Sequence, residues 1–413
     1  MSILNDVSRV LKYRARNAAV AIMARTGDPL CRIMHRPAGE HTVYAELRAR
    51  GPVHQPKQGP PLLLSHRLCS EVLRDTRIGM RLPGGRSASP NNTLSGTFIE
   101  YDPPDHTRLR RLAAPAFRPR LLRDYRTRIE KVTLDLLHSA VRKGEFDLVT
   151  DFASPLPIAV ISDLLGIPDE HADRFARNGR LMAESPMGTS RLGHQRAINA
   201  AIADLGRLFA DLMEQRRADP RDDVISLLTA AESEDRITAD ELVKTCGLLL
   251  IAGFETTVNL IGNATKLLTD DHPAQWALLK QDPDLAPRAV EEVLRYAPPV
   301  PFASRICQET VDLDGRSLPP KTMLMLLFAA ANRDPEAYAE PDQFLLERAA
   351  GEPEHLSFSS GIHYCLGAPL ARMEGEVALR AMIELMPNLR VIGEPTPRPT
   401  NVLRGYLHLP VAV

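Results

Sequence analysis

One cysteine of this chain stands between two glycines, in the segment FSSGIHYCLG (Phe358 to Gly367). The residues after it have a helical pattern, in which Pro369 suits the first turn and apolar residues mark one face. Cys365 is therefore expected just before a helix N-terminus, where the helix dipole and free N–H groups favour a thiolate over a thiol. Gly361 and Gly367 allow the backbone to turn sharply or to approach a large, flat group. A thiolate held in this way is a metal ligand or a nucleophile.

The composition of the 413 residues limits the class of protein. A formal net charge of −1 argues against a protein that binds nucleic acid, because such proteins are usually basic. The five cysteines are widely spaced and form no C-x-x-C pair: Cys31, Cys69, Cys246, Cys307 and Cys365. This pattern disfavours a disulfide framework or a zinc knuckle and is typical of a reducing cytoplasm.

No apolar run reaches the ~18 residues that a membrane span needs. The N-terminus has basic residues before a short apolar run, but Arg25 follows at once and no small-residue cleavage site closes the run. We interpret residues 1–40 as an N-terminal extension whose basic helix packs on the domain, with a helix on a membrane surface as the alternative. Residues 41–413 are expected to form a single domain.

Helical spacing dominates the chain, and strand signals are few. Apolar residues follow one face of a long helix that ends before Pro220. A second long helix is expected from Thr238, which forms a capping box with Glu241, to about Asp270. Alternation around an Asp-Gly turn predicts a small hairpin from residue 310, and residues 403–413 predict another short strand pair. Residues 83–92 and 178–188 are predicted loops, either over a binding site or simple connections. The predicted fold class is mainly α with small β regions.

The pattern F-x-x-G-x-[HR]-x-C-x-G, here Phe358, Gly361, His363, Cys365 and Gly367, resembles the haem-binding loop of the cytochromes P-450. The resemblance covers most of the chain and implies the fold of that family, with a long central helix over the haem. It implies that haem b (iron protoporphyrin IX) is the cofactor, that these residues bind it, and that the cysteine is the iron ligand. The alternatives are a buried structural cysteine and a cysteine hydrolase, although the glycine loop suits a flat cofactor better than a hydrolase.

A second segment, AGFETT (Ala252 to Thr257), lies inside the long predicted helix. A glycine there costs about 1 kcal/mol, and a buried carboxylate costs more. The resemblance implies that Ala252 and Gly253 lie against the haem and that Glu255 and Thr256 are the catalytic acid–alcohol pair, which relays protons through water. A packing defect in a core helix is the alternative.

Charged residues extend the resemblance. Glu292 and Arg295 lie three residues apart in EEVLR, which alone is a weak signal. The family has a buried Glu–Arg pair here, and the arginine that completes it in a later loop matches Arg348. The resemblance implies that these three residues support the cysteine loop structurally.

The two haem propionates need cations nearby. By resemblance these contacts are His106 and Arg110, four residues apart on a helix that is expected to start at Asp102, together with Arg305 and His363. Ordinary surface charge is the alternative for each of them.

The resemblance also implies a substrate pocket lined mostly by apolar residues: Met182, Met187, Leu249, Gly253, Val300, Phe302, Leu403 and Arg404. Such a lining predicts a hydrophobic substrate, namely a lipid, fatty acid, terpenoid, sterol or macrolide. Arg404 either holds a carboxylate, which favours a fatty acid, or is a surface charge. Plain core packing is the alternative for each lining residue.

The resemblance implies a haem-thiolate monooxygenase that uses O2 to hydroxylate or epoxidise a hydrophobic small molecule. The chain has no G-x-G-x-x-G motif and no cysteine cluster, so electrons are expected from a separate ferredoxin or flavodoxin and its reductase. A cytoplasmic location is expected. Two rival functions remain: a peroxide-driven enzyme, which does not need the acid–alcohol pair, and a non-catalytic haem protein.

Overall fold

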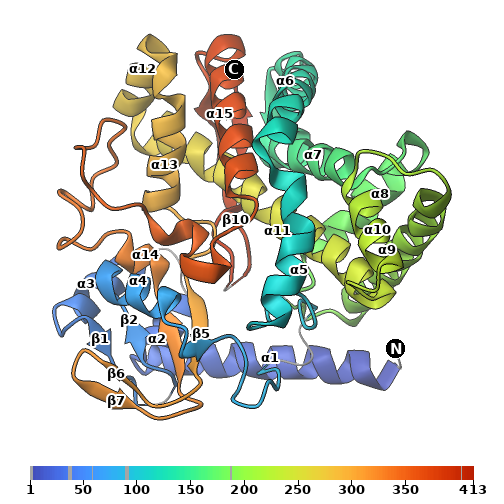
Figure 1. Cartoon of the computed structure of the whole chain (residues 1–413). Coiled ribbons are helices and arrows are strands. Elements are labelled where there is room, and N and C mark those ends of the chain that lie inside the picture. The colour runs from blue at the N-terminus through green and yellow to red at the C-terminus, as the bar shows by residue number, and fades with distance from the viewer. Residues whose placement is uncertain (1–2, 36–39, 58, 89–92, 187, 401) are drawn as a thin grey trace. The chain divides into compact units, whose positions relative to one another are not determined.

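The computed structural model describes residues 3–35, 40–57, 59–88, 93–186, 188–400 and 402–413 (Figure 1). The chain divides into two compact units. The first unit comprises Met1–Ala18, Ser87–Val132 and Ser154–Glu255, and the second comprises Ala19–Arg86, Thr133–Ala153 and Thr256–Val413. The described residues are mainly helical with small sheets, which confirms the predicted fold class.

The first unit is built from helices. It contains α5 (Asp105–Ala113), α7 (Pro155–Leu165), α8 (Asp169–Ala183), α9 (Leu192–Ala218) and α10 (Val224–Ser233), with the first parts of α1 (Ile3–Arg25), α6 (Pro119–Val141) and α11 (Ala239–Lys266). Helices α8 and α9 pack through an edge-to-face pair of Phe175 and Phe209, whose ring centroids are 6.4 Å apart. Helix α9 ends before Pro220, as predicted.

The N-terminal basic segment is helical, as expected. In the first unit, the Arg14 Nε donates to the Ser190 carbonyl at 2.8 Å, and the Asn199 amide donates to the Asp6 carboxylate at 2.6 Å. These bonds tie the first part of α1 to the segment that contains α9. The boundary at residue 40 and the single domain from residue 41 stay predictions.

The long helix α11 begins at the predicted capping box. The Glu241 N–H donates to the Thr238 hydroxyl at 3.2 Å, and the Glu241 carboxylate accepts the Thr238 N–H at 2.9 Å. A π-helical turn, Leu267–Asp271, follows the helix. By length and hydropathy the stretch Ala239–Asp271 is able to span a membrane, but 83% of its apolar window is buried inside the protein. Such burial is typical of the core helix of a globular domain.

The second unit combines helices with small sheets. Its helices are α2 (Pro29–His35), α3 (Glu40–Arg48), α4 (His66–Arg74), α12 (Pro273–Gln281), α13 (Ala286–Tyr296), α14 (Phe328–Ala331) and α15 (Ala368–Leu385), of which α13 packs on α15 (Figure 1). The largest sheet has the order β1 (Val53–His54), β2 (Leu62–Leu63), β8 (Met323–Leu326), β5 (Ala303–Cys307), β3 (Ile78–Gly79). Strands β2 and β8 are parallel and the other neighbours antiparallel.

The hairpin that the sequence predicts is present. Strand β6 (Val311–Leu313) pairs with β7 (Arg316–Leu318) in antiparallel register. The turn residues Asp314 and Gly315 have φ values of 53° and 72°. Positive φ at both positions is typical of a type I′ turn, which is the reason an Asp-Gly pair signals a hairpin.

The predicted pairing of the C-terminal strands is wrong. Strand β11 (Tyr406–His408) pairs with β10 (Thr396–Pro397), whereas β12 (Pro410–Ala412) lies between β4 (Glu145–Asp147) and β9 (Arg390–Val391). A single residue, Leu409, separates β11 from β12. One residue is too short for a hairpin loop, so the two strands cannot fold back on each other.

Two other local predictions are partly wrong. The loop expected at 178–188 begins only after α8 ends at Ala183, because Gly179 is accommodated in the helix. A Cβ at Gly179 would lie 3.3 Å from side-chain atoms of Ile158 and Leu250. The helix expected from Asp102 starts at Asp105, since two prolines follow Asp102 and restrict the backbone before them. The described part of 83–92 is a loop, as predicted, and residues 89–92 and Met187 lie outside the described residues.

Candidate functional site

The loop before α15 holds Cys365 as the sequence predicts. Two short 3-10 turns, Leu356–Phe358 and Gly361–His363, precede the cysteine. The Cys365 N–H donates to the Phe358 carbonyl at 2.8 Å, and its own carbonyl accepts the Ala368 N–H at 3.3 Å. These two bonds close the loop onto itself and place the thiol just before the N-terminus of α15.

A close backbone approach explains the first glycine of the loop. Gly361 has a φ of +66°, and a Cβ there would collide with the Leu73 carbonyl oxygen at the end of α4. The Arg74 Nε donates to the Ser360 hydroxyl at 2.9 Å. Since the loop lies directly against α4, any side chain at position 361 would push the loop away from that helix.

Cys365 differs from the other cysteines in its exposure. It is half-buried, whereas Cys31, Cys69, Cys246 and Cys307 are buried. Burial raises the pKa of Cys31 to about 11 and that of Cys246 to about 12, so these two stay protonated at neutral pH. The described ranges contain no group of three or more His, Cys, Asp or Glu side chains placed to share a metal. An accessible cysteine outside any such group fits the thiolate ligand of a haem iron.

The middle of α11 has an uncovered face. Ala252 is exposed and Gly253 and Thr256 are half-buried, while every other residue from Thr245 to Thr265 is buried. The three positions lie on one side of the helix, because Thr256 is four residues after Ala252 and three after Gly253, and residues three or four apart share a face. Such a patch of small side chains in a core helix fits a flat group lying against it, so the residues present here and at Cys365 are compatible with haem. Glu255, next to Thr256, is buried.

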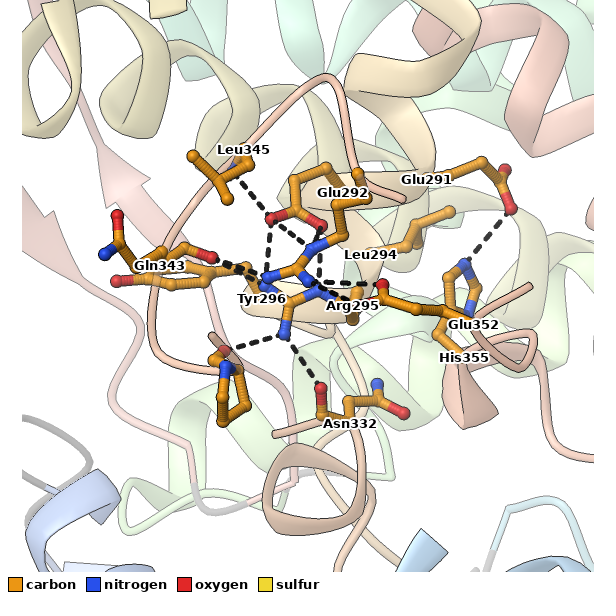
Figure 2. A network of polar contacts seen from close by, with 12 residues as sticks. Glu291, Glu292, Leu294, Arg295, Tyr296, Asn332, Gln343, Leu345, Glu352 and His355 are labelled. Carbon is orange, nitrogen blue, oxygen red and sulfur yellow. Dashed lines mark hydrogen bonds and ion pairs between the residues drawn. The ribbon is translucent and has the colours of Figure 1, made fainter. Parts of the chain in front are cut away.

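The three residues predicted to support the loop are in contact (Figure 2). The Arg295 Nε and Nη2 donate to the Glu292 carboxylate at 2.7 and 2.8 Å, and the Arg348 Nε donates to it at 2.9 Å. The same carboxylate accepts the Leu345 N–H at 2.8 Å. The side chains of Glu292 and Arg295 are both only 3% exposed. The buried carboxylate of Glu292 therefore binds two guanidinium groups, and the guanidinium of Arg348 also pairs with Glu352 at 3.1 Å.

A hydrogen-bonded path runs from this triad to the cysteine loop. The Arg295 Nη1 donates to the Asn332 carbonyl at 2.9 Å. The Asn332 side chain accepts the Leu356 N–H at 2.8 Å and donates to the Ser357 hydroxyl at 2.9 Å. Ser357 in turn donates to the Leu294 carbonyl at 2.6 Å. The segment that begins the loop is thus held by α13, the helix that carries Glu292 and Arg295.

Sequence reasoning missed a second polar cluster, centred on Arg372 of α15. Its guanidinium donates to Glu291 at 2.7 and 3.0 Å, to Glu354 at 2.9 Å and to the Tyr364 hydroxyl at 2.9 Å. It also stands 4.6 Å from the centroid of the Phe358 ring. The signal in the sequence was the first glutamate of EEVLR, which lies beside Glu292 and was left unused. The cluster joins α13, α15 and both ends of the cysteine loop.

The pKa of Glu291 depends on the charged groups of this cluster. Burial acts to raise the pKa of Glu291, but hydrogen bonds from His355 and Arg372 outweigh burial and lower it to about 2. The His355 Nδ1 accepts the Ser357 N–H at 3.3 Å, so the proton sits on Nε2, which is 3.4 Å from Glu291. The carboxylate therefore stays ionised throughout the physiological range.

The residues predicted to contact the haem lie in both units. Arg305, on β5, is buried and donates to the Ser359 hydroxyl of the cysteine loop at 3.4 Å, so the structure brings it to the loop that also carries His363. His106 and Arg110 lie one turn apart on α5 in the first unit. Burial lowers the pKa of His106, and the nearby Arg110 lowers it further. The assignment of His106 and Arg110 to the propionates stays a prediction.

The pocket residues also divide between the units. In the first unit Met182 and Leu249 are buried, and the Met182 Cε packs against Gly247 of α11, where a Cβ would lie 2.7 Å away. The second unit contains the other four described residues, Val300, Phe302, Leu403 and Arg404, and the first three are half-buried. Arg404 is not a surface charge, as one alternative held. Its side chain is 12% exposed and forms an ion pair with Glu40 at 3.0 Å.

One buried carboxyl predicts a pH dependence of stability. Burial raises the pKa of Glu374, on α15, from 4.5 to about 8. No described group bonds to its Oε2. At pH values between these two, the folded protein holds a proton that the unfolded chain releases, so the stability this proton supports falls as pH rises, by up to ~1.4 kcal/mol per pH unit. We expect Glu374→Gln to raise the melting temperature at pH 8–9 and to match the wild type near pH 4.

The exposed Glu384 of the same helix provides the control, because Glu384→Gln removes a charge that solvent already screens. The measurement is the melting temperature of each variant minus that of the wild type, from pH 4 to 9. A difference for Glu374→Gln that does not change with pH would show that Glu374 is ionised in the folded protein.

Comparisons with known proteins agree with the site. The family profile described as "Cytochrome P450" matches residues 264–387. The 6-deoxyerythronolide B hydroxylase of Saccharopolyspora erythraea is 36% identical over 393 residues, which cover 90% of this chain and 95% of that protein. The vitamin D(3) 25-hydroxylase of Pseudonocardia autotrophica is 38% identical over 387 residues, covering 90% and 93%.

A solved structure shares the fold as well. The crystal structure of P450BioI in complex with acyl carrier protein ligated to hexadec-9Z-enoic acid has a TM-score of 0.83 and 32% identity, and covers 92% of this chain and 99% of that chain. Identity at this level over nearly the whole length establishes the family. The chain belongs to the cytochrome P450 family, and as a member it is a monooxygenase with haem b, iron protoporphyrin IX, as its cofactor.

Proposed function

We propose that this monooxygenase hydroxylates or epoxidises a hydrophobic small molecule (a lipid, fatty acid, terpenoid, sterol or macrolide) in the cytoplasm, with electrons from a separate ferredoxin or flavodoxin and its reductase. The observation that carries the proposal is the uncovered face of α11, where a threonine hydroxyl stands beside small residues. Relatives whose names state a 6-deoxyerythronolide B hydroxylase and a vitamin D(3) 25-hydroxylase support this range of substrates.

The chain's residues have distinct roles in this proposal. When bound, the haem with its thiolate ligand supplies O2 activation and insertion of one oxygen atom into the substrate. Cys365 provides the thiolate, held by the closed loop and the N-terminus of α15. Arg305, His363, His106 and Arg110 would bind the propionates.

Glu255 and Thr256 are assigned to proton delivery. They are consecutive on α11, so their side chains leave the helix about 100° apart. Only Thr256 belongs to the uncovered face, and Glu255 is buried behind it. We therefore assign the Thr256 hydroxyl to passing a proton into the site and the Glu255 carboxyl to supplying it through water.

Replacing Thr256 with alanine tests the proposal. With a ferredoxin and its reductase, we expect product formation to fall by about a hundredfold or more while NADPH consumption continues, because protons no longer arrive in step with electrons. Turnover driven by peroxide alone should change little, since peroxide already carries its protons. Product and NADPH are measured together to give the coupling ratio.

Thr265→Ala is the matched control, because this buried threonine lies on the same helix and its hydroxyl donates to the Ile261 carbonyl at 3.0 Å. Its coupling ratio should equal that of the wild type. If Thr256→Ala also keeps that ratio, Thr256 is not a proton relay. A wild-type enzyme that turns over with peroxide but not with any ferredoxin or flavodoxin system would establish the peroxide-driven rival instead.

A further inference from the structure

The C-terminal turn borders the uncovered face of α11. After Thr256, that side of the helix continues with Asn259, Leu260 and Asn263, and all three are buried. A Cβ at Gly405 would collide with the Asn259 side chain, and the Asn263 amide donates to the Arg404 carbonyl at 3.4 Å. Asn263 lies seven residues beyond Thr256, or about 10 Å along the helix. The turn that carries Leu403 and Arg404 thus begins where the uncovered face ends.

The turn is also fixed to the loop that carries two other predicted pocket residues. The backbone N–H of Arg404 donates to the Pro299 carbonyl at 2.9 Å. The Asn263 amide donates to the Ala297 carbonyl at 3.1 Å. Val300 and Phe302, which follow in this loop, are half-buried and apolar, as is Leu403. Arg404 is therefore the charged member of this part of the predicted lining.

All three nitrogens of the Arg404 guanidinium donate to the protein itself. Its Nε and Nη2 donate to the Glu40 Oε2 at 3.1 and 3.0 Å. The Nη2 also donates to the Ile33 carbonyl at 3.3 Å, and the Nη1 donates to the Thr400 carbonyl at 3.4 Å. The side chains of Arg404 and Glu40 are only 12% and 8% exposed. A ligand carboxylate that pairs with the Nε–Nη2 edge would have to displace a carboxylate that the fold already holds in place.

We propose that Glu40 sets the substrate class of this enzyme by neutralising Arg404, so that uncharged hydrophobic molecules, such as esters, lactones or sterols, bind in preference to free carboxylic acids. This inference rests on the proposed function and narrows it. Glu40 acts through Arg404 and is a positioning residue for specificity. An acidic ligand gains no charge-assisted bond from Arg404 and must still shed its hydration shell, whereas a neutral ligand of the same shape pays no such cost.

The test compares palmitic acid and methyl palmitate, two ligands that differ in charge and by one methyl group. Each is titrated into the holoenzyme at pH 8, and the shift of the haem spin state gives its Kd. For the wild type we expect the ester to bind at least about tenfold more tightly than the acid. In Glu40→Gln, which frees Arg404, the Kd of the acid should fall by about tenfold or more while that of the ester stays within about threefold.

Two variants serve as controls. Glu40→Asp keeps the ion pair and should keep the preference for the ester. The double variant Glu40→Gln, Arg404→Gln removes both charges, so the gain for the acid should disappear. The wild-type comparison needs no variant, so the test does not depend on the stability of Glu40→Gln.

The outcomes separate this inference from the proposed function. A wild type that binds the acid as tightly as the ester, or a Glu40→Gln variant that gains nothing for the acid, would overturn the role of Glu40 alone. A reduced wild type whose carbon monoxide difference spectrum lacks the band of a thiolate ligand would overturn the proposed function, whatever the affinities.

Discussion

Replacing Cys365 with serine is expected to abolish the thiolate band in the carbon monoxide difference spectrum of the reduced protein. A serine hydroxyl does not ionise at neutral pH and is a hard oxygen donor, so it cannot replace the soft, anionic sulfur. Monooxygenase turnover should fall by more than the ~10–100-fold that changes around metal ligands cost, because the ligand itself is lost. Difference spectroscopy and product analysis, both on purified protein reconstituted with hemin, measure the two effects.

Cys31→Ser is the matched control for this substitution. Cys31 lies on α2, is less than a tenth exposed and is the most accessible of the four cysteines outside the loop. Its removal should leave the spectrum and the turnover as in the wild type. A thiolate band that persists in Cys365→Ser, or that disappears in Cys31→Ser, would show that Cys365 is the wrong assignment for the iron ligand.

The parts of the site that the sequence predicts are those written in contiguous residues. The cysteine loop needs only Phe358 to Gly367, and the capping box needs only Thr238 and Glu241, three residues apart. Their geometry follows mostly from local backbone rules, since a helix start and a positive φ are short-range requirements. The collision that Gly361 avoids is with Leu73, far away in the sequence, and only the structure shows it.

Distant pairings were not predictable in the same way. The partner of Arg404 is Glu40, 364 residues earlier in the chain. No local pattern distinguishes this arginine from a surface charge or a ligand anchor. The cluster around Arg372 likewise gathers side chains from α13, α15 and the segment before the loop. The predicted pairing of the C-terminal strands with each other was also wrong, because their partners β4, β9 and β10 all lie outside residues 403–413.

The triad lies between these cases, because its spacing was visible but its burial was not. Alone, two charges three residues apart are worth a few tenths of a kcal/mol on an exposed helix. Only the fold shows that Glu292 and Arg295 are both 3% exposed and that Arg348 arrives from a later loop. A Glu and an Arg three residues apart in the sequence can therefore be either a minor surface pair or part of a buried charge network.

Glu292→Gln is expected to destabilise the fold by about 3–5 kcal/mol, the usual effect of leaving a buried charge uncompensated. The amide keeps the shape of the carboxylate, but Arg295 then loses its carboxylate partner, Arg348 keeps only Glu352, and one amide N–H faces donors at 2.7 to 2.9 Å. The measurements are the urea midpoint followed by circular dichroism and the fraction of purified protein that holds haem.

The neighbouring glutamate of the same helix turn provides a sharp control. Glu291 also pairs with an arginine, Arg372, but its side chain is 41% exposed, so Glu291→Gln should cost about 1 kcal/mol or less. Equal effects of the two substitutions would show that burial does not decide the result.

The path through Asn332 adds a second expectation for Glu292→Gln. Because the Asn332 side chain holds Leu356 and Ser357 at the start of the cysteine loop, loss of the triad should loosen that loop before the helices unfold. The haem absorbance of Glu292→Gln is then lost at a lower urea concentration than the helical signal, whereas in the wild type the two transitions lie closer together. Transitions that separate no further than in the wild type would mean that the triad stabilises the unit as a whole and does not hold the loop in particular.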